Sequence, residues 1–149
     1  MSDVDEFRAK SIHVLLVEDN RVNQIVASGF LKAWGIKIDI ANNGMEAVEM
    51  VRRNAYDMVL MDVQMPVMDG YEATQKIRAL NEPYFKELPI IALTASAMLG
   101  MRDKALEVGM NEFITKPFVP ASLKATIYKF VLQGKQPERS EYEAQIETR

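Results

Sequence analysis

Five short apolar runs alternate along the chain with segments of helical spacing, and this alternation constrains the fold most strongly. The runs predicted to form strands are residues 12–17, 36–40, 58–61, 90–93 and 112–115. Strands that alternate with helices pair in parallel and leave helices on both faces of the sheet. The expected fold class is therefore α/β, a doubly wound five-stranded parallel sheet with five helices.

The strands differ in their pattern, and the difference predicts where the sheet reverses. The first run is apolar throughout, which is typical of a central strand, whereas the second alternates isoleucine with Lys37 and Asp39, as an edge strand does. The strand order must therefore reverse beside the first strand. Doubly wound sheets carry their sites outside the carboxyl ends of the strands at such a reversal.

The length of 149 residues fits one compact domain with short tails. We expect a polar N-terminal extension over residues 1–10, a domain over residues 11–132, and a polar tail or linker over residues 133–149. The absence of cysteine excludes a disulfide framework and thiolate zinc sites, and a single histidine, His13, excludes a His-rich metal centre.

The charge and hydropathy of the chain exclude further classes of function. A net charge of −3 gives no overall reason to bind nucleic acid. No apolar run approaches the roughly 20 residues that span a bilayer. The acidic N-terminus does not resemble a signal peptide. We expect a cytoplasmic protein that contacts neither membrane nor nucleic acid.

Polar side chains follow the strands where each strand ends. Glu18 and Asp19 follow the first strand, Asp62 the third, Thr94 the fourth and Lys116 the fifth. Because the first and third strands are expected to be neighbours, the three carboxylates should converge. Like charges held together repel unless a cation joins them, and a few carboxylates with water suit Mg²⁺.

A lysine and a hydroxyl beside acidic metal ligands indicate a bound phosphoryl group, since such a site neutralises and orients phosphoryl oxygens. No Walker glycine loop is present, so a nucleotide is not the expected donor. An aspartate can itself be the nucleophile and form an aspartyl phosphate. Asp62, at the centre of the group, is the natural candidate.

Four motifs in this order and spacing resemble the receiver domain of two-component response regulators, which has a CheY-like, flavodoxin-like fold. The motifs are VEDN (17–20), MDVQMPVMDG (61–70), LTA (93–95) and KPF (116–118). The resemblance covers residues 11–132 and implies the strand order 2-1-3-4-5. It implies that Asp62 accepts a phosphoryl group from a phosphohistidine on a histidine kinase or a histidine phosphotransfer protein.

The resemblance also implies roles for the surrounding residues. Mg²⁺ would be held by the side chains of Glu18, Asp19 and Asp62 and by the backbone carbonyl of Gln64. Lys116 would pair with the phosphoryl oxygens and precede a cis peptide bond to Pro117. As a switch, Thr94 would turn toward the phosphoryl group and Phe113 would move inward. The face of the fourth and fifth helices and the fifth strand would serve output or homodimerisation.

The subtype and the rival functions stay open in the sequence. VEDNRVNQ and GMNEFITKPF resemble receivers embedded in hybrid sensor histidine kinases, and a stand-alone single-domain regulator is the alternative. A receiver is not an enzyme by itself beyond self-phosphorylation and slow self-dephosphorylation. A Mg²⁺-dependent phosphohydrolase would need an acid/base aspartate at position 64, where Gln64 stands. A phosphorylation-dead receiver is disfavoured because the acidic residues, Thr94 and Lys116 are all present.

Overall fold

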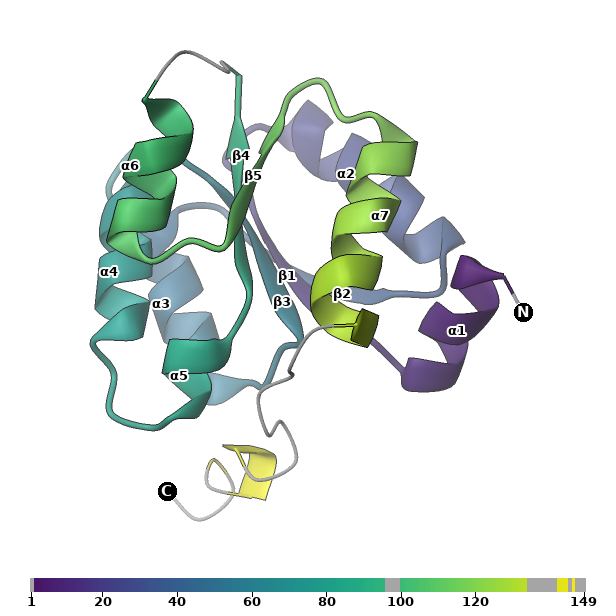
Figure 1. Ribbon diagram of the computed structural model, residues 1–149. Coiled ribbons are helices and arrows are strands. Elements are labelled where there is room, and N and C mark those ends of the chain that lie inside the picture. Colours follow the sequence, from purple (N-terminus) through teal and green to yellow (C-terminus); the bar gives the residue numbers. More distant parts are fainter. Residues whose placement is uncertain (1, 96–99, 134–141, 145, 147–149) are drawn as a thin grey trace.

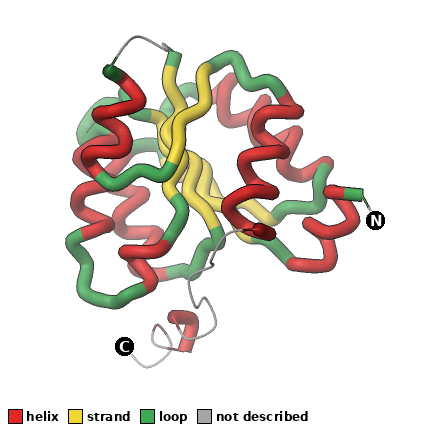
Figure 2. The backbone as a smooth tube through the Cα atoms, viewed as in Figure 1, coloured by secondary structure: helices red, strands yellow, loops and turns green. Residues whose placement is uncertain are grey.

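A parallel five-stranded sheet lies between two layers of helices in the computed structural model, which describes residues 2–95, 100–133, 142–144 and 146 (Figures 1 and 2). The strands are β1 (His13–Val17), β2 (Lys37–Ala41), β3 (Met58–Asp62), β4 (Ile90–Thr94) and β5 (Glu112–Thr115). The helices are α1 (Asp3–Lys10), α2 (Arg21–Ala33), α3 (Gly44–Arg53), α4 (Gly70–Arg78), α5 (Tyr84–Glu87), α6 (Met101–Val108), α7 (Pro120–Ile127) and the π-helical η1 (Tyr128–Gln133).

The strand order β2-β1-β3-β4-β5 confirms the predicted reversal beside β1. All four neighbouring pairs are parallel. The apolar strands β3 and β4 are buried along their whole length, while β2 is the partly exposed edge strand that its alternating pattern predicts.

Alternate residues of the strands supply two separate cores, one on each face of the sheet. In β1, Leu15 and Val17 pack beneath α3, α4, α5 and α6, whereas Val14 and Leu16 pack beneath α1, α2 and α7. Burial on both faces explains why the central strands are continuously apolar. It also leaves only the strand ends free to carry polar chemistry.

Polar side chains cap the N-termini of three helices that follow strands, at the carboxyl ends of the strands. Asn20 accepts a hydrogen bond from the Asn23 backbone at 3.0 Å and begins α2, and Asn43 does the same for α3 through Glu46 at 2.9 Å. Asp69 caps α4 by accepting from the Glu72 backbone at 2.8 Å. These caps satisfy backbone donors of the first turn and set where each helix starts relative to the strand end.

The prediction of five helices was wrong. In the described ranges, the helices α1 and α5 and the π-helical η1 accompany the five that follow strands. Helix α1 forms because Ser2 and Asp5 make a capping box and because Phe7 is fully buried against the sheet. Helix α5 forms after Pro83 because Tyr84 and Phe85 are buried.

Part of the polar C-terminal tail also packs on the domain. Tyr142 is 1% exposed and its ring stacks on Tyr84 with a centroid distance of 4.1 Å. Its hydroxyl donates to the backbone carbonyl of Val51 at 2.7 Å. None of the helices in the described ranges combines the length and the apolar character that crossing a bilayer requires.

Candidate functional site

Three carboxylates converge at the carboxyl ends of β1 and β3, as their positions in the sequence predict. Glu18 and Asp19 directly follow β1, and Asp62 is the last residue of β3, the neighbouring strand. One carboxylate oxygen from each residue lies within 4.8 Å of the others. Glu18 and Asp62 are buried, whereas Asp19 is exposed, so the group opens to solvent on one side.

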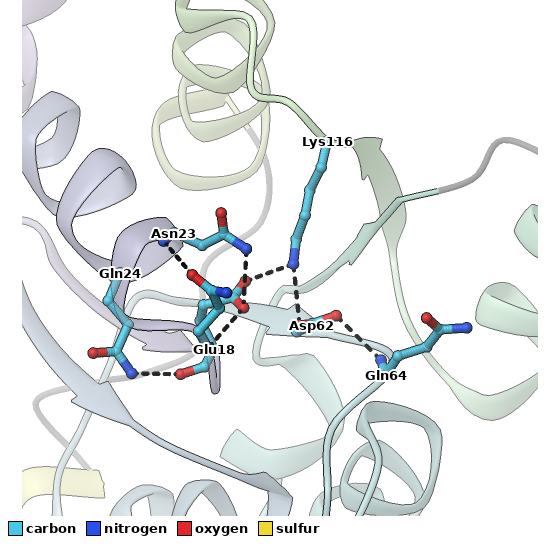
Figure 3. A network of polar contacts seen from close by, with 7 residues as sticks. Glu18, Asn23, Gln24, Asp62, Gln64 and Lys116 are labelled. Atoms are coloured by element: carbon cyan, nitrogen blue, oxygen red, sulfur yellow. Dashed lines mark hydrogen bonds and ion pairs between the residues drawn. The ribbon is translucent and has the colours of Figure 1, made fainter.

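Lys116 reaches this group from the end of β5 (Figure 3). Its Nζ lies 2.6 Å from Glu18 Oε2 and 3.0 Å from Asp62 Oδ2. The Lys116 backbone donates to the Thr94 carbonyl at 2.7 Å, which fixes the start of the side chain beside the end of β4. The peptide bond between Lys116 and Pro117 is cis, as expected. One ammonium group thus contacts two buried carboxylates.

The surroundings of Asp62 and Lys116 shift both pKa values upward. Burial raises the pKa of Asp62 to about 6, and the charge of Glu18 acts in the same direction. A hydrogen bond from the Gln64 backbone, at 3.1 Å, and one from Lys116 oppose this rise without cancelling it. For Lys116, burial alone lowers the pKa, but the contacts with Glu18 and Asp62 outweigh burial and raise it. Lys116 is therefore charged at neutral pH.

The donor set fits a hard divalent cation. It offers carboxylate oxygens only, which Mg²⁺ prefers, and one member of the group is open to solvent for the waters that Mg²⁺ retains. Glu18 Oε1 accepts hydrogen bonds from the Asn20 backbone and the Asn23 side chain, at 3.2 and 3.4 Å. Glu18 Oε2 is buried and accepts no hydrogen bond among the described residues, although it faces the Lys116 ammonium. Three acidic groups and one lysine leave negative charge that a cation would balance.

The two residues predicted to switch lie on β4 and β5, the strands that follow β3 in the sheet. Thr94 is the last residue of β4, is 4% exposed, and pairs with Thr115 across the sheet. Phe113 lies on β5 opposite Ala92, is half-buried, and packs against the core beneath α6. Both are close to the carboxyl ends of the strands, and their movement stays a prediction.

Two residues of the site were not singled out from the sequence. Asn23 and Gln24, in the first turns of α2, both donate hydrogen bonds to Glu18 (Figure 3). The sequence offered little signal for Gln24, because it shares the buried face of α2 with Ala27, Ser28 and Leu31 while apolar residues of the same helix, such as Ile25, are exposed. Sequence alone does not reveal which groups such an amide meets.

Comparisons with known proteins assign the family. Residues 14–128 match the family of response regulator receiver domains. The chain is 45% identical over 125 residues to hybrid signal transduction histidine kinase B of Dictyostelium discoideum, covering 78% of this chain and 6% of that protein. This chain belongs to the response regulator receiver domain family. It spans between 6% and 15% of the length of the first curated relatives.

Two solved structures share the fold. The receiver domain of the sensor histidine kinase PA1611 from Pseudomonas aeruginosa, which has a magnesium ion coordinated in its active site cleft, is 41% identical with a TM-score of 0.75. The alignment covers 81% of this chain and 98% of that one. The receiver domain of Saccharomyces cerevisiae Ssk1, in complex with the histidine phosphotransfer protein Ypd1, is 33% identical with a TM-score of 0.74, over 83% and 90% of the chains.

Proposed function

We propose that this receiver domain accepts a phosphoryl group on Asp62 from a phosphohistidine of a histidine kinase or a histidine phosphotransfer protein. The observation that carries the proposal is the setting of the Asp62 carboxylate. It is buried, lies within 4.8 Å of two further acidic groups, and receives a hydrogen bond from Lys116 at 3.0 Å. The complex of a related receiver with a histidine phosphotransfer protein supports the class of partner.

In the proposed reaction, a carboxylate oxygen of Asp62 forms a bond to phosphorus while the bond between phosphorus and the partner's imidazole nitrogen breaks. The electron pair of the broken bond stays on the imidazole. The nucleophile must be ionised, and a pKa of about 6 leaves Asp62 mostly ionised at neutral pH. Lys116 supplies a fixed positive charge to the transferring group, which lowers the energy of a transition state with charge on its equatorial oxygens.

Glu18, Asp19 and Asp62, together with the backbone carbonyl of Gln64, would hold Mg²⁺. The cation, when bound, neutralises charge on the phosphoryl oxygens. The acidic group and the magnesium-bound receiver that is 41% identical to this chain support this assignment.

Phosphorylation would then bias the conformation of the domain. It adds roughly −1.5 to −2 charge at Asp62 and new acceptor oxygens. The Thr94 hydroxyl would donate to one of these oxygens, and Phe113 would follow into the space that Thr94 leaves. Both residues adjoin the face formed by α6, β5 and α7, which is the proposed surface for output or for a homodimer.

The parent protein in this proposal is a cytoplasmic receiver-bearing hybrid histidine kinase, since hybrid kinases are among the relatives of this chain. A stand-alone regulator with the same acceptor chemistry is the alternative. The isolated domain would phosphorylate itself from a small donor and lose the phosphate slowly, without turnover of other substrates. The exposed amide of Gln64, in place of a second catalytic acid, disfavours a phosphohydrolase.

Replacement of the acceptor tests the proposal. Asp62→Asn keeps the shape of the side chain but removes the nucleophile, so labelling by acetyl phosphate in the presence of Mg²⁺ should fall to background. Intact-mass spectrometry would measure the added phosphoryl group on wild type and variant. Undiminished labelling of Asp62→Asn would refute the assignment, and rapid turnover of a phosphate monoester by the wild type would favour the hydrolase.

An exposed apolar face of α2 offers the phosphodonor a place to dock. Val22, Ile25 and Val26 are 66%, 61% and 45% exposed, and α2 begins two residues after Asp19. Ile25 also lines a surface hollow of about 310 Å³ that reaches Ile40 on β2. A protein that brings a histidine to Asp62 must cover the surface beside it, and exposed apolar side chains there favour contact with an apolar surface of the partner.

A charged substitution on this face separates docking from chemistry. Ile25→Asp should lower phosphotransfer from a phosphohistidine protein that labels the wild-type chain by about tenfold or more, because burying an unpaired charge is costly. Labelling by acetyl phosphate should not change. Leu106→Asp on α6, where the leucine is 46% exposed, serves as the control and should transfer normally. If Ile25→Asp lowered labelling by acetyl phosphate as much as phosphotransfer from the protein donor, Ile25 would support the structure of the site rather than docking.

A further inference from the structure

Gln24 is a buried amide on α2 that lies directly against the main chain of the acidic site. Gln24 is only 8% exposed. Nε2 carries two hydrogens, and both are donated, one to the backbone carbonyl of Glu18 at 2.6 Å and one to Asn42 Oδ1 at 2.9 Å. The bond to the Glu18 carbonyl is buried, so its loss would leave a buried acceptor unsatisfied, whereas Asn42 is exposed.

The bond from Gln24 to Asn42 connects the acidic site to the loop that follows β2. Asn42 follows β2, and its backbone and side chain both donate to Glu46 Oε1, at 3.1 and 3.2 Å. The Glu18 backbone donates to the Ala41 carbonyl at 3.0 Å. The main chain of Glu18 is therefore held through its N–H by β2 and through its carbonyl by Gln24.

The carbonyl that Gln24 holds belongs to the peptide group joining Glu18 to Asp19, the two adjacent acids of the site (Figure 3). Rotation of this peptide would move both side chains relative to Asp62. Mg²⁺ tolerates little departure from octahedral geometry, so its affinity depends on how firmly such ligands are oriented. Groups that orient metal ligands without touching the metal typically change affinity by about 10- to 100-fold when removed.

We infer that Gln24 is a positioning residue that orients the Glu18–Asp19 pair for binding of a divalent cation, with Asn42 as its anchor on the neighbouring loop. The inference rests on the proposed function, since it assumes that the acidic pair binds Mg²⁺. Asn23 adds to the same arrangement by donating to Glu18 Oε1 at 3.4 Å. Gln24 itself touches no predicted reacting atom.

Gln24→Met tests the inference, because methionine has similar length and no hydrogen-bond donor. Isothermal titration of the full chain with MgCl₂ should show binding weakened by about tenfold. The melting temperature in EDTA would report separately any loss of stability. A purely structural role would lower that melting temperature and leave the dissociation constant for Mg²⁺ unchanged, which would overturn the inference.

Ser28→Ala is the matched control, one helical turn further along α2. Ser28 is also buried, at 7% exposure, and its hydroxyl has no hydrogen-bond partner among the described residues. Its removal should leave the affinity for Mg²⁺ unchanged. If Ser28→Ala weakened binding as much as Gln24→Met, a general disturbance of α2 would explain both results and the inference would fail.

A second variant keeps the inference testable if Gln24→Met does not fold. Asn42→Ala removes the anchor together with its side-chain bond to Glu46. It should weaken Mg²⁺ binding in the same direction by a smaller factor, and an unchanged affinity would contradict the inference. Failure of the proposed function has a different signature. In that case the wild-type chain itself would show neither binding of Mg²⁺ nor labelling by acetyl phosphate.

Discussion

At the scale of single residues, Gly70 determines how closely α4 approaches β3, the strand that ends at Asp62. A Cβ at this position would lie 2.2 Å from the Asp62 backbone oxygen and 2.9 Å from Met61 Cγ. Gly70→Ala should therefore shift the main chain of Asp62 or the start of α4, with an expected loss of roughly 1–3 kcal/mol in the free energy of unfolding. Urea denaturation followed by circular dichroism would measure the loss.

Gly29→Ala is the counterpart with the opposite expected sign. Gly29 lies within α2, and a Cβ there would meet nothing within 4 Å. Alanine should stabilise the helix by about 0.5–1 kcal/mol because it restricts the unfolded chain. If both alanine variants shifted stability equally, the close approach at Gly70 would not be the cause of its requirement for glycine.

The residues of the site divide into those that the sequence could predict and those that it could not. The positions of Glu18, Asp62 and Lys116 were predictable because parallel strands bring their carboxyl ends to one edge of the sheet. A polar residue that follows an apolar run must therefore lie at that edge. The partners of Gln24 were not predictable, because they depend on the register between α2 and the loop after β2. Only the three-dimensional path of the chain brings Asn42 to that amide.

At the scale of elements, the tail and α5 form an aromatic contact at the end of the sheet away from the acidic site. The ring of Tyr142 packs on Tyr84 and, edge-on, on Phe85 at a centroid distance of 5.0 Å. Tyr84 in turn donates to and accepts from the Tyr56 backbone, both at 2.6 Å. Residues far apart in the sequence thus pack together in the core beneath α3, α4, α5 and α6.

Substitution of Tyr142 tests whether this contact stabilises the fold. Tyr142→Ala should lower the free energy of unfolding by roughly 2–4 kcal/mol through lost aromatic burial. Tyr142→Phe should cost about 1 kcal/mol, because it keeps the ring and removes the hydrogen bond to the Val51 carbonyl. Urea midpoints would compare the two variants. An unchanged midpoint for Tyr142→Ala would show that the packed tail adds nothing to stability.

The elements that the sequence did not predict share a physical cause. Helix α1 has a recognisable capping box, but its single buried side chain, Phe7, gives no apolar stripe to detect. Helix α5 has four residues, too few for any periodicity, and it is stabilised by its contacts rather than by helical propensity. The tail is polar in composition, so the burial of Tyr142 had no signal in its neighbours. Strands and long helices were predictable because each repeats its pattern over several residues.

At the scale of the whole molecule, the proposed binding of a cation is linked to folding through Asp62. The pKa of Asp62 is raised from 3.8 to about 6, chiefly by burial. Without the cation, the folded chain therefore binds a proton at Asp62 more tightly than the unfolded chain does, and protonation of Asp62 stabilises the folded state. This contribution is fully present below the unfolded pKa, near 4, and is lost as the pH rises through about 6. Mg²⁺ requires the ionised carboxylate, so its own stabilising effect has the opposite dependence on pH.

Mg²⁺ should consequently raise the melting temperature of the domain above pH 6 and do so much less below it. At a free concentration about ten times its dissociation constant, a ligand of the folded state adds about 1.4 kcal/mol, or roughly 3–6 °C for a domain of this size. At about pH 5, a carboxyl with a pKa of about 6 is only about one-tenth ionised, so the apparent affinity for Mg²⁺ should fall about tenfold. Scanning calorimetry in MgCl₂ and in EDTA at both pH values would measure the difference. Asp19→Asn, at the exposed member of the group, should reduce the shift at neutral pH, and a shift that persisted at acid pH would mean that the cation binds without Asp62.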